Sequence, residues 1–138
     1  MLIFNEDLLN MENLVNYWRI SSIDDFESAK DIFSRTHRIT QALFFLHLAI
    51  EKALKALVVF RTNQHTPLTH NLLSLATKAQ IDLSTDQRTF LAEVNEFNLE
   101  CRYPEDIQEL KQKATQAFAN FYFQKGEIFH LWILEQLK

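Results

Sequence analysis

The sequence predicts an all-α protein in which a few long helices pack as one domain over residues 1–138. The first observation is the scarcity of turn residues, since the chain has one Gly and two Pro, and sheet proteins build their many turns from such residues. The second is the recurrence of apolar residues at helical spacing along several long segments. The third is a composition of 47% hydrophobic and 23% charged residues, which is ordinary for a globular domain that needs no disulfide or metal at this length.

The first helix is predicted from about Met11 to Arg35. Its apolar residues recur near helical spacing, and they are Leu14, Tyr17, Trp18, Phe26, Ala29, Ile32 and Phe33. Residues 21–25, with the sequence Ser-Ser-Ile-Asp-Asp, interrupt this pattern. Because Ser and Asp side chains compete with the helix for backbone hydrogen bonds, we expect either a kink or a break there.

The second helix, from about His37 to Phe60, is the most strongly indicated element. It has a continuous apolar stripe, which consists of Ile39, Leu43, Leu46, Ile50, Ala53, Leu54 and Leu57. A polar loop follows at residues 61–67. A short helix is then expected from about Thr69 to Ala79, with Thr69 as its N-cap.

Two more helices complete the chain. Ser84 and Gln87 have the spacing of a capping box, in which both side chains satisfy backbone amides, so the fourth helix begins there and ends before Pro104. The last helix is predicted over residues 105–137, weakened at Gly126 by roughly 1 kcal/mol relative to Ala. Its apolar residues cover more than one face, and the chain has twelve Phe. The second face is therefore expected to pack against another copy of the protein.

Charge and composition exclude several classes of function. The formal net charge of −4 argues against nonspecific binding to a nucleic-acid backbone, although it permits a local basic site. The single cysteine, Cys101, excludes an internal disulfide and a cysteine-based zinc site, and one Gly excludes a Gly-rich phosphate loop. We expect neither a metal nor a cofactor.

The N-terminus lacks the basic residues of a signal peptide, and no apolar run reaches the roughly 20 residues of a membrane span. Both observations predict a cytoplasmic protein.

The second helix carries a group of charged side chains with two interpretations. His47, Glu51 and Lys55 are spaced at i, i+4 and i+8 and share one face. Lys52 lies beside them. In the structural interpretation they form a solvated face with a weak Glu51–Lys55 ion pair. In the functional interpretation Lys52 and Lys55 bind a phosphate while Glu51 orients them. Spacing alone favours the structural interpretation.

Two further segments combine polar and aromatic residues at expected helix ends. His70, near the start of the third helix, either bonds to the backbone or contacts a nucleotide, because histidine exchanges protons near neutral pH. Arg102 and Tyr103, in the turn before the last helix, either fix the end of the bundle or bind a phosphate and stack on a base. Asn98 and Glu100 would flank that site.

Three of these segments together resemble the HEPN family, the nucleotide-binding domain of higher eukaryotes and prokaryotes. Residues 49–56 resemble its Ala-x-Glu-Lys-x-x-Lys-Ala segment, and residues 69–72 resemble Thr-His-Asp-Leu, with Asn71 in place of Asp. Residues 102–104 match its Arg-Tyr-Pro. Three other residues look like the first helix of the family: Trp18, Asp25 and Ala29. The resemblance therefore runs over nearly the whole chain.

The resemblance implies an up-and-down bundle of four to five helices, similar to the C-terminal domain of kanamycin nucleotidyltransferase, and it implies a homodimer. Some family members are ribonuclease toxins paired with a minimal nucleotidyltransferase antitoxin, and others bind nucleotides or serve as a substrate-binding subunit. The ribonucleases carry an Arg followed, after four to six residues, by a His. Here three residues separate Arg61 from His65, and eight separate Arg61 from His70. Eight residues also separate Arg38 from His47, so the ribonuclease motif is absent.

We therefore predict a non-catalytic HEPN domain that binds a nucleotide, a short RNA or a nucleotidyltransferase subunit. The predicted ligand-binding residues are Glu51, Lys52, Lys55, His70, Asn98, Arg102 and Tyr103. One alternative is a metal-independent ribonuclease, in which His70 is the general base and Arg102 stabilises the phosphate transition state. Another is an adaptor that binds a protein through the aromatic C-terminal helix.

Overall fold

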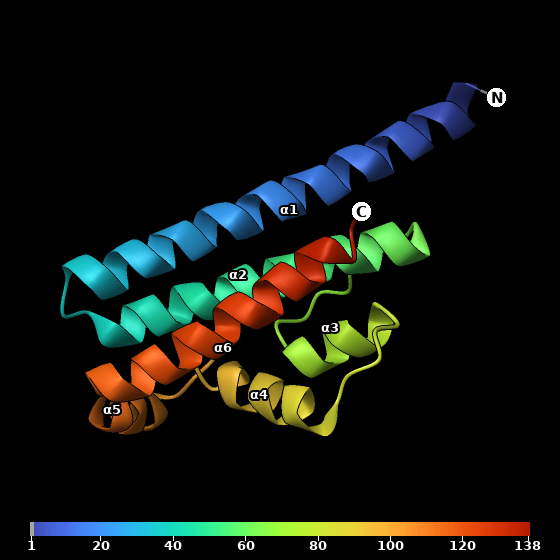
Figure 1. Ribbon diagram of the computed structural model, residues 1–138. Coiled ribbons are helices and arrows are strands. Elements are labelled where there is room, and N and C mark those ends of the chain that lie inside the picture. Colours follow the sequence, from blue (N-terminus) through green and yellow to red (C-terminus); the bar gives the residue numbers. More distant parts are fainter. Residues whose placement is uncertain (1) are drawn as a thin grey trace.

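The fold is that of a computed structural model, which describes the backbone of residues 2–138 and the side chains of residues 10–138. This part of the chain forms six helices and no strand (Figure 1). In chain order the helices are α1 Leu2–Arg35, α2 Ile39–Thr62, α3 Leu72–Lys78, α4 Thr85–Asn95, α5 Pro104–Lys113 and α6 Gln116–Glu135. The predicted all-α bundle is confirmed.

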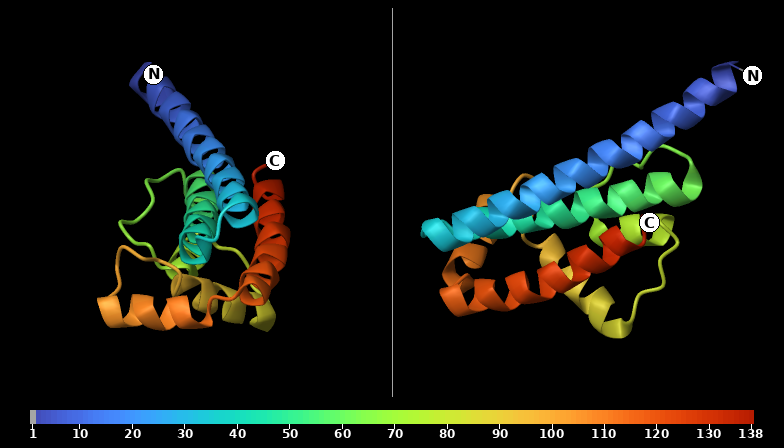
Figure 2. Two further views of the ribbon diagram at one scale, coloured as in Figure 1. Left: turned by 90° about the vertical axis from the view of Figure 1, so that its left-hand side faces the viewer. Right: turned by 45° about the horizontal axis from the view of Figure 1, so that its top comes forward.

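Helix α2 lies at the centre of the bundle. It contacts α1, α3, α5 and α6. Helix α1 runs antiparallel along one side of α2, and the small helices α3 to α5 lie on the side away from α1 (Figures 1 and 2). The central position explains the continuous apolar stripe, because neighbours surround the helix. Most of the predicted stripe is fully buried, namely Leu43, Leu46, Ile50, Ala53, Leu54 and Leu57.

Helix α1 is continuous, so the interruption predicted at residues 21–25 is not observed, and the helix begins before Met11. The side chains of Ser21, Ser22 and Asp25 bind α2 instead of competing for their own backbone. The Ser22 hydroxyl donates a hydrogen bond of 2.5 Å to the Ala49 carbonyl, and Asp25 forms an ion pair described below. Tertiary contacts thus satisfy the groups that would otherwise disturb the helix.

Side chains cap the beginnings of α3 and α4. The N-cap of α3 is Asn71 and not Thr69, as the sequence had predicted, because the Thr69 hydroxyl accepts a hydrogen bond from the Asn71 N–H instead. Asn71 Oδ1 accepts hydrogen bonds of 3.0 and 3.3 Å from the backbone N–H groups two and three residues further on. The capping box predicted for α4 is confirmed, with reciprocal bonds between Ser84 and Gln87.

The prediction of a single helix over residues 105–137 is wrong. The structure has two helices there, α5 and α6, which meet at Ala114 and Thr115. The Thr115 hydroxyl caps α6 by accepting a hydrogen bond of 3.2 Å from the Phe118 N–H, as Thr commonly does at a helix start. Figure 2 shows α6 leaving α5 at a sharp angle, which lets α6 run along α2.

Helix α6 approaches α2 closely at Gly126. A Cβ atom at that position would lie 2.8 Å from Leu46 Cδ1, so the glycine permits a contact that a larger residue would prevent. The sequence had predicted only a weakened helix there. Another face of α6 exposes Phe121, Ile128 and Leu131. None of the described helices has both the length and the hydropathy of a membrane span.

Candidate functional site

A buried carboxylate on α2 forms the centre of the candidate site. Glu51 is only 3% exposed, and its Oε2 lies 2.9 Å from Lys55 Nζ. Its Oε1 lies 3.1 Å from Nδ1 of His70, which belongs to the loop between α2 and α3. A buried charge needs such partners, because an uncompensated carboxylate away from water is costly. Together with the neighbouring His47, we call these residues the Glu51 cluster.

The carboxylate orients the imidazole of His70. Since an ionised carboxylate only accepts hydrogen bonds, Nδ1 of His70 carries a proton in this contact. The side chain is 51% exposed, and Nε2 has no hydrogen-bond partner in the described part of the chain. His70 therefore offers Nε2 to a ligand in a fixed orientation.

Two asparagines hold the segment that carries His70. Asn71 Oδ1, besides capping α3, accepts a hydrogen bond of 3.2 Å from Asn95 Nδ2. Asn95 Oδ1 in turn accepts a hydrogen bond of 2.9 Å from the Leu72 N–H. These bonds fix the start of α3 to the last turn of α4. The Asn71 that replaces the Asp of the family pattern thus acts as a helix cap and as a link between two helices.

His47 lies on the buried side of the carboxylate. Its Nδ1 is 3.8 Å from Glu51 Oε1, too far for a hydrogen bond, and neither ring nitrogen has a partner among the described residues. Burial lowers the pKa of His47, while the nearby Glu51 carboxylate opposes this shift. The ring is therefore neutral at pH 7. The helical spacing predicted that His47 and Glu51 share a face, but not that this face is buried.

Lys55 is held between the carboxylate and an aromatic ring. Its Nζ lies 4.9 Å from the ring centroid of Trp18 on α1, a distance typical of a cation–π interaction. The sequence had connected Trp18 only with the first helix of the family. The charge of Lys55 is therefore already compensated within the protein, and a phosphate would have to compete with Glu51 and Trp18 for the ammonium group.

Lys52 faces α1 and joins the two long helices. Its Nζ lies 2.7 Å from Asp25 Oδ2 and 2.8 Å from Ser21 Oγ. In the part of the chain that the structure describes, it makes no hydrogen bond or ion pair with the Glu51 cluster. Because Asp25 compensates its charge, the arrangement supports a structural role for Lys52.

The other predicted residues lie in the turn between α4 and α5. Asn98 is buried, and its Oδ1 accepts a hydrogen bond of 3.1 Å from the Glu100 N–H, which stabilises the turn. Tyr103 is 76% exposed and does not fill the end of the bundle. Among the described side chains, neither Arg102 nor Tyr103 forms a hydrogen bond or an ion pair with the Glu51 cluster.

Arg102 has acidic surroundings. It lines a pocket of about 240 Å³ together with Glu96, Asp106, Glu109 and Lys113. Lys113 pairs with Glu96 at 3.3 Å, which leaves two carboxylates around one guanidinium. Arg102 Nε is buried without a hydrogen-bond partner in the described residues. A pocket with this charge disfavours a phosphate, so the surroundings of Arg102 weaken its predicted role.

The chemical groups of the Glu51 cluster are one carboxylate, one ammonium and two imidazoles. Within the described residues, no three His, Cys, Asp or Glu side chains gather closely enough to hold a metal ion.

Comparisons with known proteins agree with the resemblance seen in the sequence. The fold is similar to the crystal structure of TT1696 from Thermus thermophilus, with a TM-score of 0.73 and 18% sequence identity, over 89% of this chain and 98% of that chain. At this identity the match shows a shared fold. A search of curated proteins finds no match. The family model of the HEPN domain matches residues 15–132. Because this match covers most of the chain, the protein belongs to the HEPN domain family.

Proposed function

We propose that the protein binds a nucleotide or a short RNA at the Glu51 cluster without cleaving it. The observation that carries this proposal is the half-exposed imidazole of His70, which the buried Glu51 carboxylate holds in place. A neutral Nε2 accepts a hydrogen bond from a ribose hydroxyl or a base N–H group, and a protonated one donates to a phosphate. Membership in a family that generally binds nucleotides supports the same ligand class.

The charges around the cluster support binding over catalysis. Metal-independent cleavage of RNA needs a base and also a group that stabilises the charge developing on the phosphate. Lys52 and Lys55 already form ion pairs with Asp25 and Glu51, respectively, so neither ammonium group is free to stabilise that charge. The Arg and His spacing of the family's ribonucleases is also absent from the sequence.

A metal-independent ribonuclease is the second candidate, and one observation favours it. A buried carboxylate that binds one imidazole nitrogen and leaves the other accessible is the arrangement that orients histidine general bases. His70 and Glu51 have this arrangement. Arg102 would then stabilise the phosphate, but the carboxylates around it oppose that role.

We also propose that the protein forms a homodimer and that a minimal nucleotidyltransferase, as in toxin–antitoxin pairs, is a suitable protein partner. The support for a dimer is the exposed apolar face of α6. The same face would serve an adaptor, which is the third candidate.

Thermal unfolding with a panel of nucleotides and short RNAs tests the binding proposal. A ligand that binds only the native state raises the unfolding midpoint by mass action. We expect a higher midpoint with at least one probe while the RNA stays intact. His70→Ala should lose this response, because it removes the oriented Nε2. His65→Ala is the matched control, since His65 is an exposed residue of the same loop, and it should respond like the wild type.

The same experiment separates the candidates. RNA cleavage that disappears in His70→Ala would replace the proposal with the ribonuclease. Equal midpoint shifts in both variants would remove His70 from the site. If no probe causes a midpoint shift and none is cleaved, the result would contradict nucleotide binding and favour the adaptor.

A further inference from the structure

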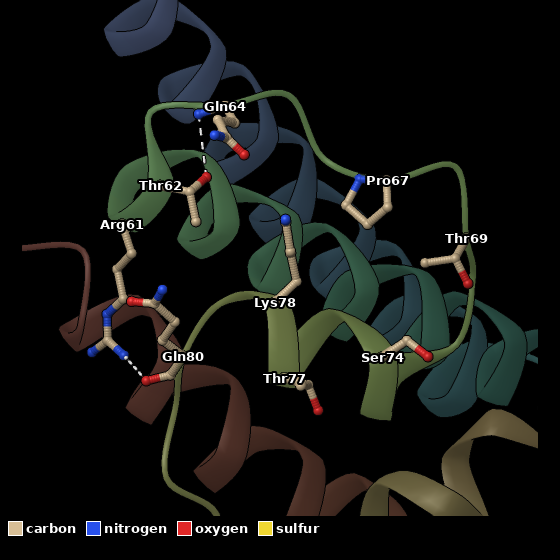
Figure 3. A pocket seen from close by; sticks show the side chains of 9 residues that line it. All are labelled: Arg61, Thr62, Gln64, Pro67, Thr69, Ser74, Thr77, Lys78 and Gln80. Carbon is tan, nitrogen blue, oxygen red and sulfur yellow. Dashed lines mark hydrogen bonds between the residues drawn. The ribbon is translucent and has the colours of Figure 1, made fainter.

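A polar pocket lies between the last turn of α2, the loop that follows it and α3 (Figure 3). Its volume is about 940 Å³. The nine lining residues comprise two cations, four residues with hydroxyl groups, two glutamines and one proline, and none of them is acidic. The pocket is distinct from the Glu51 cluster, because Glu51 and Arg61 are ten residues apart on α2, or about 15 Å along the helix.

The two cations give the pocket a positive charge that nearby carboxylates do not compensate. Arg61 donates hydrogen bonds to the carbonyl oxygens of Ala79 and Gln80 and to the amide oxygen of Gln136, all neutral acceptors. Lys78 forms no ion pair with any side chain that the structure describes. In a chain with 18 acidic and 14 basic residues, such a pocket attracts an anion.

Hydrogen-bond donors in the pocket are unused. Ser74 and Lys78 are four residues apart and share one face of α3. Figure 3 shows the Lys78 ammonium extending toward the space below Gln64 and Pro67. The Ser74 hydroxyl and the Gln64 side-chain amide form no hydrogen bond within the described residues. By contrast, the Thr62 hydroxyl donates to a backbone carbonyl of its own helix.

We propose that this pocket binds the phosphate or diphosphate group of a nucleotide, with Lys78 as the main charge. Lysine binds phosphate as a point charge with three donors, and the volume is within the range of small-molecule sites. Thr69 lines the pocket and His70 is the next residue. Only one part of the inference rests on the proposed function, namely that the phosphate belongs to a nucleotide. The phosphate site itself rests on the pocket.

The test is the unfolding midpoint of the full chain as a function of pyrophosphate concentration. We expect the wild-type midpoint to rise at pyrophosphate concentrations up to about 10 mM. Lys78→Gln should need about tenfold more pyrophosphate for the same rise, because it removes the uncompensated charge. Ser74→Ala should weaken the response less, since it removes one neutral donor. Lys111→Gln is the control, because Lys111 is an exposed lysine of α5 outside the pocket, and it should behave like the wild type.

A second series with ADP identifies the source of the phosphate. A stronger response to ADP that Lys78→Gln still weakens supports a nucleotide, and an equal response supports the phosphate group alone. No shift in the wild type, or the same shift in Lys78→Gln, would overturn the inference. A pyrophosphate response lost in His70→Ala but kept in Lys78→Gln would place the phosphate at the Glu51 cluster, so the inference would fail while the proposed function stands.

Discussion

At the scale of single residues, His130 of α6 makes the stability of the folded protein depend on pH. The ring is buried, stacks on Phe26 with centroids 4.8 Å apart, and its Nε2 lies 2.7 Å from the Ser22 hydroxyl. Since Ser22 donates its only hydrogen to the Ala49 carbonyl, Nε2 must donate to Ser22. The contact therefore joins α1, α2 and α6 through one serine.

Burial lowers the pKa of His130 from 6.5 to about 4, so the unfolded chain binds a proton at pH values where the native ring stays neutral. The contribution to stability is complete above pH 6.5 and is lost as the pH falls toward 4, at a cost of about 3 kcal/mol. His130→Gln should flatten the dependence of the free energy of unfolding on pH over this range. Urea unfolding at a series of pH values measures it.

His37 supplies the control for the pH experiment. It is exposed in the turn between α1 and α2, so His37→Gln should keep the wild-type pH profile. Part of the slope should persist in His130→Gln, because burial also lowers the pKa of His47. A profile of His130→Gln parallel to that of the wild type would show that another group causes the acid sensitivity.

At the scale of elements, the packing of α6 on α2 depends on Gly126. An alanine Cβ would lie 2.8 Å from Leu46 Cδ1, and Leu46 is fully buried, so it has little room to move. Overpacking of this kind costs about 1–3 kcal/mol, while alanine gains about 1 kcal/mol over glycine in a helix. We expect Gly126→Ala to lower the free energy of unfolding by about 1 kcal/mol in urea titrations.

The Leu46→Ala variant, used as a second background, separates the effect of the clash from the effect of helix propensity. In Leu46→Ala the clashing atoms are absent, so adding Gly126→Ala should raise stability relative to Leu46→Ala alone. Asn120→Ala, at an exposed position of α6, should stabilise the protein slightly through propensity. If Gly126→Ala stabilised the wild type as much as the Leu46→Ala variant, the close approach at Gly126 would not restrict the side chain.

The elements differ in how far their sequences predict them. Helix α2 and the capping box of α4 were predicted because an apolar stripe and a cap are local patterns. The division between α5 and α6 was not, since Thr115 is tolerated within a helix and packing of α6 against α2 favours the break. The continuity of α1 was missed for the converse reason, as Ser22 finds its partner on another helix.

At the scale of the whole molecule, the candidate site was predictable only in part. Spacing placed Glu51 and Lys55 on one face, and the family resemblance added His70. The burial of Glu51 and Lys55 was not predictable, because the same spacing describes a solvated face and only the loop and α1 that cover α2 distinguish a buried face from a solvated one. The acidic surroundings of Arg102 come from both α4 and α5, so they depend on how these helices pack.

The outer face of α6 carries the last prediction, which concerns assembly. Ile128 is 72% exposed, and Phe121 and Leu131 are also exposed on this helix. Apolar grooves of about 320 and 380 Å³ flank α6, against α4 and α1 respectively. Ile23 of α1 is exposed too and lines the second groove with Leu131. An apolar surface that continues over neighbouring helices is typical of an interface between protein subunits.

We expect the protein to be a dimer in sedimentation-velocity experiments at micromolar concentration, with α6 in the interface. Ile128→Glu should shift the equilibrium to the monomer, because a subunit interface would bury the new charge without a partner. The fold should persist, since this side chain contacts mainly solvent in the single chain. Gln108→Glu on the exposed face of α5 adds the same charge away from α6 and should leave the dimer intact. A wild type that sediments as a monomer, or a dimer that Ile128→Glu does not weaken, would exclude this face as the dimer interface.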